Sequence, residues 1–428
     1  MSRLILTLAL LALALPAAAA TTAIVGGKVH TVGPQGTIGN ATILIVDGRI
    51  AAVGDDIEVP AGAETIDAAG KIITPGLFSP LGQLGLVEVG FSAGPLDYSQ
   101  RGNQFTAGFD VADAYNPRSS LVAINRIEGV TRAVVAPMPG YPDESGAGHI
   151  LAGLAAIVNL GDDNALDRRA AAMVVALGEY GAALSGGTRT AAWLTLRNAL
   201  DEALDYREHK GDFERGMRRD YVHSMNDLEA LQGVVNGNTP MIVGIDRASD
   251  IEVLIKLVNE YGVTAIISGG AEAWMLASEL ATAGIAVIAG PSANLPGNFD
   301  RINTRLGSAS ILINAGVKVA IADADAQTHN ARNLTQSAGN AVALGLDWDA
   351  ALRAITLSPA EIFGMAATTG SIEPGKAADI VIWPADPLEL TNYPEQVFIN
   401  GEAIPMVSRQ TLLRDRYLQT DMPPAYRK

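Results

Sequence analysis

The pattern of hydrophobic and polar positions differs between the two ends of the chain and its middle. Short runs of β-branched residues, interrupted by Gly or Asp-Gly, occupy residues 23–74. The same sequence pattern occurs again near the C-terminal end. Asp47-Gly48 and Asn400-Gly401 each separate two apolar runs, which is a strong signal for a β-hairpin. We therefore expect residues 21–74 and 368–428 to pair into one small β-sandwich domain.

Strand-like and helical runs alternate through residues 75–367. SDIEVLIKLVNEYG predicts a helix capped by Ser249 or Asp250 and ended by Gly262, because its apolar residues recur every three to four positions. Such alternation implies parallel strands, and about eight of them favour an α/β fold built on a (β/α)8 TIM-like barrel. An open doubly wound sheet is the competing fold, but no G-x-G-x-x-G opens a helix after the first strand. The predicted strands are TRAVVAP, PMIVGID, VTAIISG, IAVIAGP and KVAIADAD.

The first 20 residues predict a signal peptide. Arg3 precedes an apolar run from Leu4 to Leu15, and Ala18 and Ala20 supply the small residues of a cleavage site. A run of this length is too short to span about 30 Å of hydrocarbon. We expect cleavage near Ala20 and a soluble mature protein that is periplasmic or secreted.

Composition narrows the possible partners and chemistries. The formal net charge of −16 disfavours nucleic acid and anionic membranes as partners, because both carry negative phosphate groups. The chain has no cysteine, which excludes disulfides, thiol nucleophiles and thiolate metal sites. The Gly-rich stretches SGGTRTAAW and PMPGYPDESGAG lack the lysine pattern of a phosphate-binding loop.

A series of motifs resembles the amidohydrolase superfamily, specifically its imidazolonepropionase-like, secreted branch. The resemblance covers nearly the whole mature chain and implies a barrel with a composite β-domain. It also implies a hydrolase of non-peptide carbon–nitrogen bonds that uses metal-activated water. The motifs, in order, are GKIITPGL, GVTRAVVAPMPG, DRASDIEVLIKLVNEYGV, GGAEAW, HNARNLTQSAGNAVALGLDWDAALRAITLSPAEIFGM and GSIEPGKAADIVIW.

The resemblance implies zinc ligands that this chain lacks. A His-x-His at the end of the first barrel strand would place both imidazoles on one ion, but Leu81 and Gln83 stand there. The histidines of the fifth and sixth strands fall on Gly244 and Gly269. We therefore expect no metal cofactor, although zinc is typical of the family.

Several polar residues are left as candidates for the site. Asp323 and Asp325 are the catalytic candidates, because a carboxylate pair on one strand face can act as general acid and base. The same pair can also cap the next helix, and the spacing does not decide which of the two matches the last-strand aspartate of the family. The predicted substrate-binding residues at the barrel mouth are Gln83, Asp246, Glu272 and His329.

The other histidines give weaker signals. His149 ends a Gly-rich loop after the second strand and can approach the barrel mouth. His209 and His223 lie in a charged helical stretch and are expected to be solvated, and His30 is expected to be a surface or turn residue of the β domain.

Three interpretations stay open. The first is an exported, metal-free amidohydrolase-like protein with a small-molecule pocket at the barrel mouth, acting alone, as a homo-oligomer or beside an active relative. The second is an active hydrolase with a metal site rebuilt from carboxylates, drawn from Glu88, Asp246, Glu272, Asp323 and Asp325. The third is a structural subunit whose barrel mouth is filled by side chains.

Overall fold

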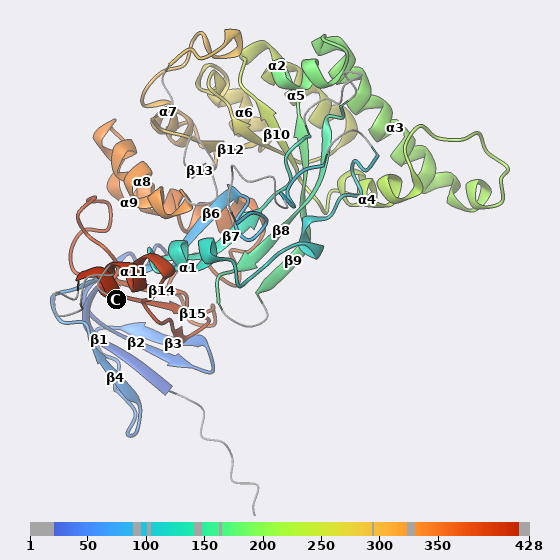
Figure 1. Ribbon diagram of the computed structural model, residues 1–428. Helices are drawn as coiled ribbons and strands as arrows, with labels where there is room; N and C mark the ends of the chain where they lie inside the picture. The colour runs from blue at the N-terminus through green and yellow to red at the C-terminus, as the bar shows by residue number, and fades with distance from the viewer. Residues whose placement is uncertain are drawn as a thin grey trace, which may run out of the picture.

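The computed structural model describes residues 21–88, 96–100, 104–140, 148–161, 165–292, 295–322 and 330–418. The predicted signal peptide and the candidates Asp323, Asp325 and His329 lie outside these residues. The described chain forms two eight-stranded sheets, one built from both ends of the chain and one from its middle (Figure 1).

The first sheet joins strands from both ends of the chain, as the sequence predicted. It is one mixed sheet in the order β16-β15-β14-β5-β1-β2-β3, and β4 also pairs with β1. The C-terminal strand β14 runs antiparallel to β5 and so ties the two ends of the chain together. The strands are β1 (Thr21–His30), β2 (Thr37–Val46), β3 (Arg49–Gly54), β4 (Glu64–Asp67), β5 (Ile72–Pro75), β14 (Ile380–Trp383), β15 (Gln396–Ile399) and β16 (Glu402–Ala403). The boundaries of the two predicted domains stay predictions.

The two predicted hairpin turns lie against each other. Asp47 and Gly48 have φ angles of 50° and 78°, and Asn400 and Gly401 have 50° and 80°, as a type I′ turn requires. A Cβ atom added at Gly48 would lie 2.5 Å from the carbonyl oxygen of Asn400. Both turns therefore need glycine at their second position, for conformation and for packing.

The second sheet is the barrel, in the order β13-β12-β11-β10-β9-β8-β7-β6. It confirms the predicted α/β barrel fold with one difference, since β8 runs antiparallel to both of its neighbours. Only residues 160–165 connect β8 to β9, and so short a connection cannot make the crossover that parallel strands need. The strands are β6 (Leu77–Gly82), β7 (Val130–Val135), β8 (Leu151–Asn159), β9 (Leu166–Ala176), β10 (Met241–Ile245), β11 (Ala265–Gly269), β12 (Ala286–Ala289) and β13 (Val319–Ile321).

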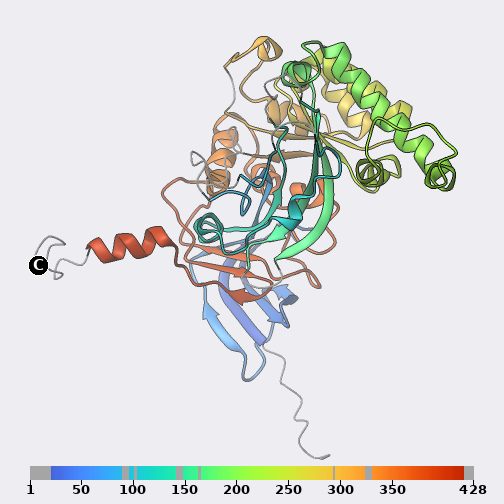
Figure 2. The ribbon, with the colours of Figure 1, turned by 45° about the vertical axis from the view of Figure 1, so that its right-hand side comes forward.

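Helices surround the barrel (Figures 1 and 2). The predicted end of α5 is confirmed, since Gly262 adopts the left-handed conformation with φ 65°. The predicted cap is wrong: the N-cap is Arg247, whose side chain makes no cap bond, and Asp250 lies in the first turn. The α-helices are α1 (Ser120–Arg126), α2 (Gly178–Leu184), α3 (Arg189–Glu214), α4 (Met225–Val235), α5 (Ala248–Tyr261), α6 (Ala277–Ala283), α7 (Ser308–Asn314), α8 (Leu334–Ala343), α9 (Trp348–Ala354), α10 (Leu357–Ile362) and α11 (Arg409–Leu418). Short 3-10 helices are η1 (Val111–Asp113), η2 (Ala273–Leu276), η3 (Phe299–Arg301) and η4 (Ala331–Asn333).

In the part of the chain that the structure describes, no helix combines the length and apolar composition needed to cross a bilayer.

Strand β14 contributes side chains to two hydrophobic cores. Ile380 and Ile382 pack in the core of the terminal sheet, whereas Val381 and Trp383 pack against the barrel and its helices. This division follows from the alternation of side chains along a strand. Trp383 also donates a 2.9 Å hydrogen bond to the hydroxyl of Thr74 on β5.

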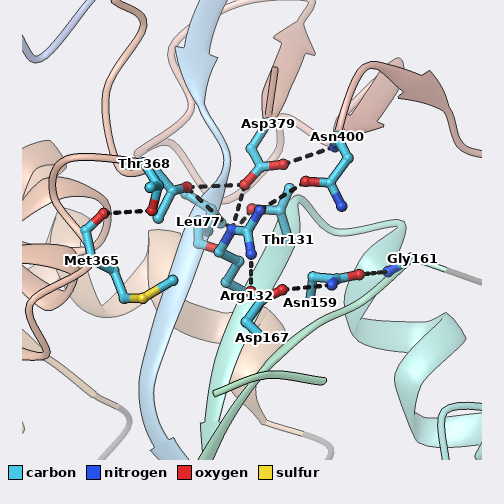
Figure 3. Close-up of polar contacts among 11 residues, drawn as sticks. Leu77, Thr131, Arg132, Asn159, Gly161, Asp167, Met365, Thr368, Asp379 and Asn400 are labelled. Atoms are coloured by element: carbon cyan, nitrogen blue, oxygen red, sulfur yellow. Dashed lines mark hydrogen bonds and ion pairs between the residues drawn. The ribbon is translucent and has the colours of Figure 1, made fainter. Parts of the chain in front are cut away.

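A buried arginine joins the barrel to the terminal sheet (Figure 3). Arg132 on β7 donates from Nε to Asp379 at 2.7 Å and from a terminal nitrogen to the side-chain oxygen of Asn400 at 2.9 Å. It also pairs with Asp167 on β9. Arg132 and Asp379 are each at most 5% exposed, so neither charge is solvated. The other residue bonded to Arg132 is Thr369.

Replacement of Arg132 by Met should destabilise the fold by about 3–5 kcal/mol, because Asp379 would stay buried, and Asp167 largely shielded from water, without their cation. The measurement is the shift of the first urea unfolding transition of the purified protein.

Arg169→Met is the matched control. Arg169 also pairs with two aspartates, Asp110 and Asp113, but its side chain is 48% exposed. Its loss should cost less than about 1 kcal/mol. Equal urea midpoints for the Arg132 and Arg169 variants would contradict a central role for Arg132.

Candidate functional site

The barrel mouth, where the parallel strands end, is lined by small and apolar side chains in the described residues. Ile242 on β10 and Ile266 on β11 pack in the barrel interior. Because side chains alternate, the next inward positions toward the mouth are Gly244 and Ser268, which pair with each other across the two strands. Leu81, the first of the two positions that correspond to a His-x-His, packs against the same interior cluster.

Gly269 has no room for a side chain. A Cβ atom there would lie 2.7 Å from Oδ1 of Asp246, and the φ angle of 98° strains any residue other than glycine. Asp246 therefore occupies the space in which any side chain at position 269 would start. Gly244 differs, because a Cβ atom there would meet only the carbonyl oxygen of Val175 at 3.8 Å.

The two acidic candidates for substrate binding are engaged in holding loops. Asp246 accepts hydrogen bonds from the backbone of Ala271 at 3.0 Å and from Nε of Arg301 at 2.8 Å. Glu272 is buried and accepts from the backbone of Ala248, at the start of α5, and from both the backbone and side chain of Asn303. Their carboxylates thus fix the loops after β11 and β12 and the start of α5.

A second acidic pair ties the same loop to the helices. Asp300 accepts from the backbone of Glu179 at the start of α2, and it pairs with Arg189 at the start of α3. Arg189 also bonds to Asp250 in the first turn of α5 at 3.1 Å. A carboxylate near a helix N-terminus is favoured by the helix dipole, so these contacts explain the acidic residues at this end of the barrel.

Of the other predicted residues, the structure describes Gln83 and Glu88. Gln83 is buried, and no hydrogen bond among the described residues joins it to either acid. Glu88 bonds instead to Asn116 and Ser119. Asp323, Asp325 and His329 lie outside the described residues, so their roles stay predictions.

The described residues do not fit the zinc site that the family resemblance implies. Leu81 cannot bind a metal, and Asp246 and Glu272 already accept hydrogen bonds on both of their oxygens. Across the part of the chain that the structure describes, no group of three or more His, Asp or Glu residues could hold a metal ion.

A cavity of about 70 Å³ lies beside Asp246 and Arg301. It is far smaller than the roughly 300–1,000 Å³ of typical ligand pockets. The described residues around Asp246 therefore leave room for a few water-sized groups only.

A larger cavity, of about 530 Å³, lies beside two histidines that were not predicted to be neighbours. His149 and His223 have ring centroids 5.8 Å apart and both line it. His223 is buried, and its Nδ1 lies 2.9 Å from Glu202, which also accepts from the backbone of Val222 and His223. The prediction that His223 is solvated is wrong, because α3 brings Glu202 against it.

The environment of His149 keeps it neutral. Burial, and secondarily the neighbouring His223, lowers the pKa of His149 to about 4. The backbone N–H of Leu151 donates to Nδ1 of His149 at 3.1 Å, so the proton is on Nε2. The cavity therefore presents a neutral imidazole beside the charged groups of Glu202 and Arg218.

His30 is also buried, contrary to the predicted surface position. Its ring lies 4.5 Å from that of Trp348, and Thr37 bonds to Nδ1 at 3.0 Å. Burial lowers its pKa, and the positive charge of Lys28 lowers it further. His30 packs the terminal sheet against α9 and takes no part in the barrel mouth.

Comparison with known sequences finds similarity to one family. A model described as the amidohydrolase family matches residues 199–404. Amidohydrolase tasK of Hapsidospora irregularis is 24% identical over 398 residues, an alignment that covers 84% of this chain and 39% of that protein. The chain thus spans well under half the length of this curated relative.

Solved structures share the fold. An amidohydrolase from Thermotoga maritima MSB8 has a TM-score of 0.79 at 23% identity, covering 90% of this chain and 99% of the other. Molinate hydrolase has a TM-score of 0.55 at 18% identity, covering 91% and 95%. A prolidase complexed with N-methylphosphonate-L-proline has a TM-score of 0.52 at 17% identity, covering 90% and 99%.

Replacement of Gly269 and of Gly244 by Ala should have opposite outcomes. Gly269→Ala should cost about 1–3 kcal/mol, because the φ angle is strained for Ala and Asp246 must move. Gly244→Ala should be neutral or stabilise by up to about 1 kcal/mol, since the site has room and Ala reduces the entropy of the unfolded chain. Urea unfolding of the two variants provides the measurement, and equal midpoints would show that Asp246 does not constrain position 269.

Proposed function

We propose that this chain is an exported member of the amidohydrolase superfamily that has lost the metal-dependent reaction and binds a small molecule in its barrel; the family match over residues 199–404 and the similarity to amidohydrolase tasK support the membership. The observation that carries the proposal is that Asp246 occupies the space in which any side chain at position 269 would start. A ligand set cannot be rebuilt at that position without moving the contacts of Asp246 with Ala271 and Arg301.

The charges at the barrel mouth support a role other than hydrolysis. Asp246 is paired with Arg301, and Glu272 is bonded to backbone groups, so the oxygens of each carboxylate are occupied by fixed donors. A general base must instead be able to reach and accept a substrate proton. The described acids of the mouth therefore act as positioning residues for loops.

The alternatives make different demands on the same residues. An active hydrolase with a rebuilt metal site needs carboxylates that converge, whereas Glu88, Asp246 and Glu272 each bond to separate partners. A structural subunit beside an active relative needs no pocket at all. The open position at Gly244, and not the small cavity beside Asp246, favours ligand binding over this second alternative.

The zinc content of the purified mature protein, dialysed without chelator, should be well below one ion per chain. The Leu81→His/Gln83→His double variant should not bind zinc tightly either, since positions 244 and 269 still supply no ligand and a catalytic zinc needs three protein ligands. Elemental analysis by mass spectrometry measures both. Stoichiometric zinc at the barrel mouth of the wild-type protein would refute the proposal, and stoichiometric magnesium or manganese would favour the rebuilt site.

A small molecule that binds at the mouth should raise the melting temperature of the wild-type protein. Thermal-shift screening identifies it, and Gln83→Ala or Asp325→Ala should abolish the shift. Asn236→Ala, at the exposed end of α4, is the control that should leave it unchanged. A ligand that stabilises all of these variants equally binds elsewhere.

Export rests on the charged start, apolar run and Ala-rich exit of residues 1–20. Mass spectrometry of the protein isolated from the periplasm or medium should give a chain that begins near Thr21. A chain that retains residues 1–20 would contradict cleavage.

A further inference from the structure

Helix α11 is an arm that contacts α1 and buries none of its own residues. Figure 2 shows this helix, Arg409–Leu418, projecting away from the two sheets. Its root is fixed, since Ser408 is buried and exchanges capping hydrogen bonds with Thr411. A helix of 10 residues is marginal in water on its own, because most helical stability in proteins comes from packing.

The arm combines apolar and basic side chains. Leu413 and Tyr417, four residues apart, share one face of the helix and are 41% and 72% exposed. Leu412 and Leu418 are also exposed. With three arginines and one aspartate the arm carries a formal charge of +2, whereas the whole chain carries −16. The arm is therefore suited to an acidic surface with exposed apolar groups.

The same chain offers such a surface in residues 384–395, between β14 and β15, which we call the acidic loop. Its charged residues are Asp386, Glu389 and Glu395. Glu395 pairs with Lys71, and Asp386 accepts from the indole of Trp348, so Glu389 is the carboxylate that the loop offers to a basic partner.

Leu390 and Tyr393 are 65% and 63% exposed. The loop is ordered by its own hydrogen bonds, since Asn392 donates from its side chain to the carbonyl oxygen of Asp386 at 2.8 Å. Its apolar groups are thus held in water by an ordered backbone.

We propose that the arm of one copy binds the acidic loop of a second copy of this chain. Within one chain both surfaces stay exposed, and no hydrogen bond or ion pair among the described residues joins them. A two-fold arrangement makes the same contact twice, arm to loop and loop to arm, so no surface is left over. Leu413 and Tyr417 then cover Leu390 and Tyr393, and Arg414 and Arg416 face Glu389. The contact includes no residue of the barrel mouth and is independent of the proposed function.

Sedimentation velocity of the mature protein over a range of concentrations tests the proposal. The wild-type protein should dimerise, and Leu413→Asp/Tyr417→Asp should raise the dissociation constant of the dimer at least about tenfold. The matched control, Leu194→Asp/Met225→Asp, alters two exposed apolar residues outside the arm and should leave the constant unchanged. Circular dichroism melting shows that each variant is folded.

A charge exchange tests the identity of the acceptor. Arg414→Glu/Arg416→Glu should weaken the dimer, and Glu389→Arg in the same chain should restore most of the affinity. A wild-type protein that stays monomeric at every concentration overturns the proposal, as does a dimer that the arm variants leave unchanged. Co-flotation of the wild-type protein, but not of the arm variant, with phosphatidylglycerol vesicles would assign the arm to a membrane and also overturn it.

Discussion

The guanidinium of Arg132 lies at the junction of every major part of the molecule. It extends from a barrel strand and bonds to one aspartate on the barrel, Asp167, and to one beside the terminal sheet, Asp379. The side chain of Asn400 brings the C-terminal hairpin to the same group. Because a buried cation is tolerated only when its donors are satisfied, the two sheets are held in one relative position. The hydrophobic contacts of Val381 and Trp383 then act on surfaces that are already aligned.

At the opposite end of the barrel, acidic residues have a different task. Asp246, Glu272 and Asp300 each accept from backbone groups at the starts of loops or helices. The long loop after β12 therefore has a fixed course over the barrel end. The barrel end is held here by positioning contacts, and glycine stands at position 269 beside Asp246. The fold and the chemistry of its mouth are thus separable, as the variety of functions on this barrel requires.

Features that depend on neighbours in the sequence were predictable. The turns at Asp47-Gly48 and Asn400-Gly401 and the end of α5 at Gly262 follow from local conformational preference. The barrel followed from the order of motifs, whereas the absence of metal ligands at Leu81, Gln83, Gly244 and Gly269 stays a prediction from the family resemblance. The relation of Gly269 to Asp246 was not predictable, because it depends on where a side chain from the preceding strand lies.

Contacts between residues far apart in the sequence could not be predicted either. The partners of Arg132 are up to 268 residues away, and no periodicity marks them. His223 was predicted to be solvated because the residues around it in the sequence are charged. A charged residue on α3, Glu202, instead bonds to His223 and covers it. The antiparallel β8 was missed for a related reason, since its apolar run resembles a buried parallel strand.

The pairing of β5 with β14 has a consequence for biosynthesis. When residues 72–75 leave the ribosome, the strand that completes their sheet lies roughly 300 residues downstream. At about 5–20 residues per second, that strand appears some 15–60 s later. Throughout this interval β5 has an open edge of unpaired backbone groups, the feature by which strands recruit wrong partners. A chain interrupted before residue 380 would keep that edge permanently and would stay open to pairing with other strands.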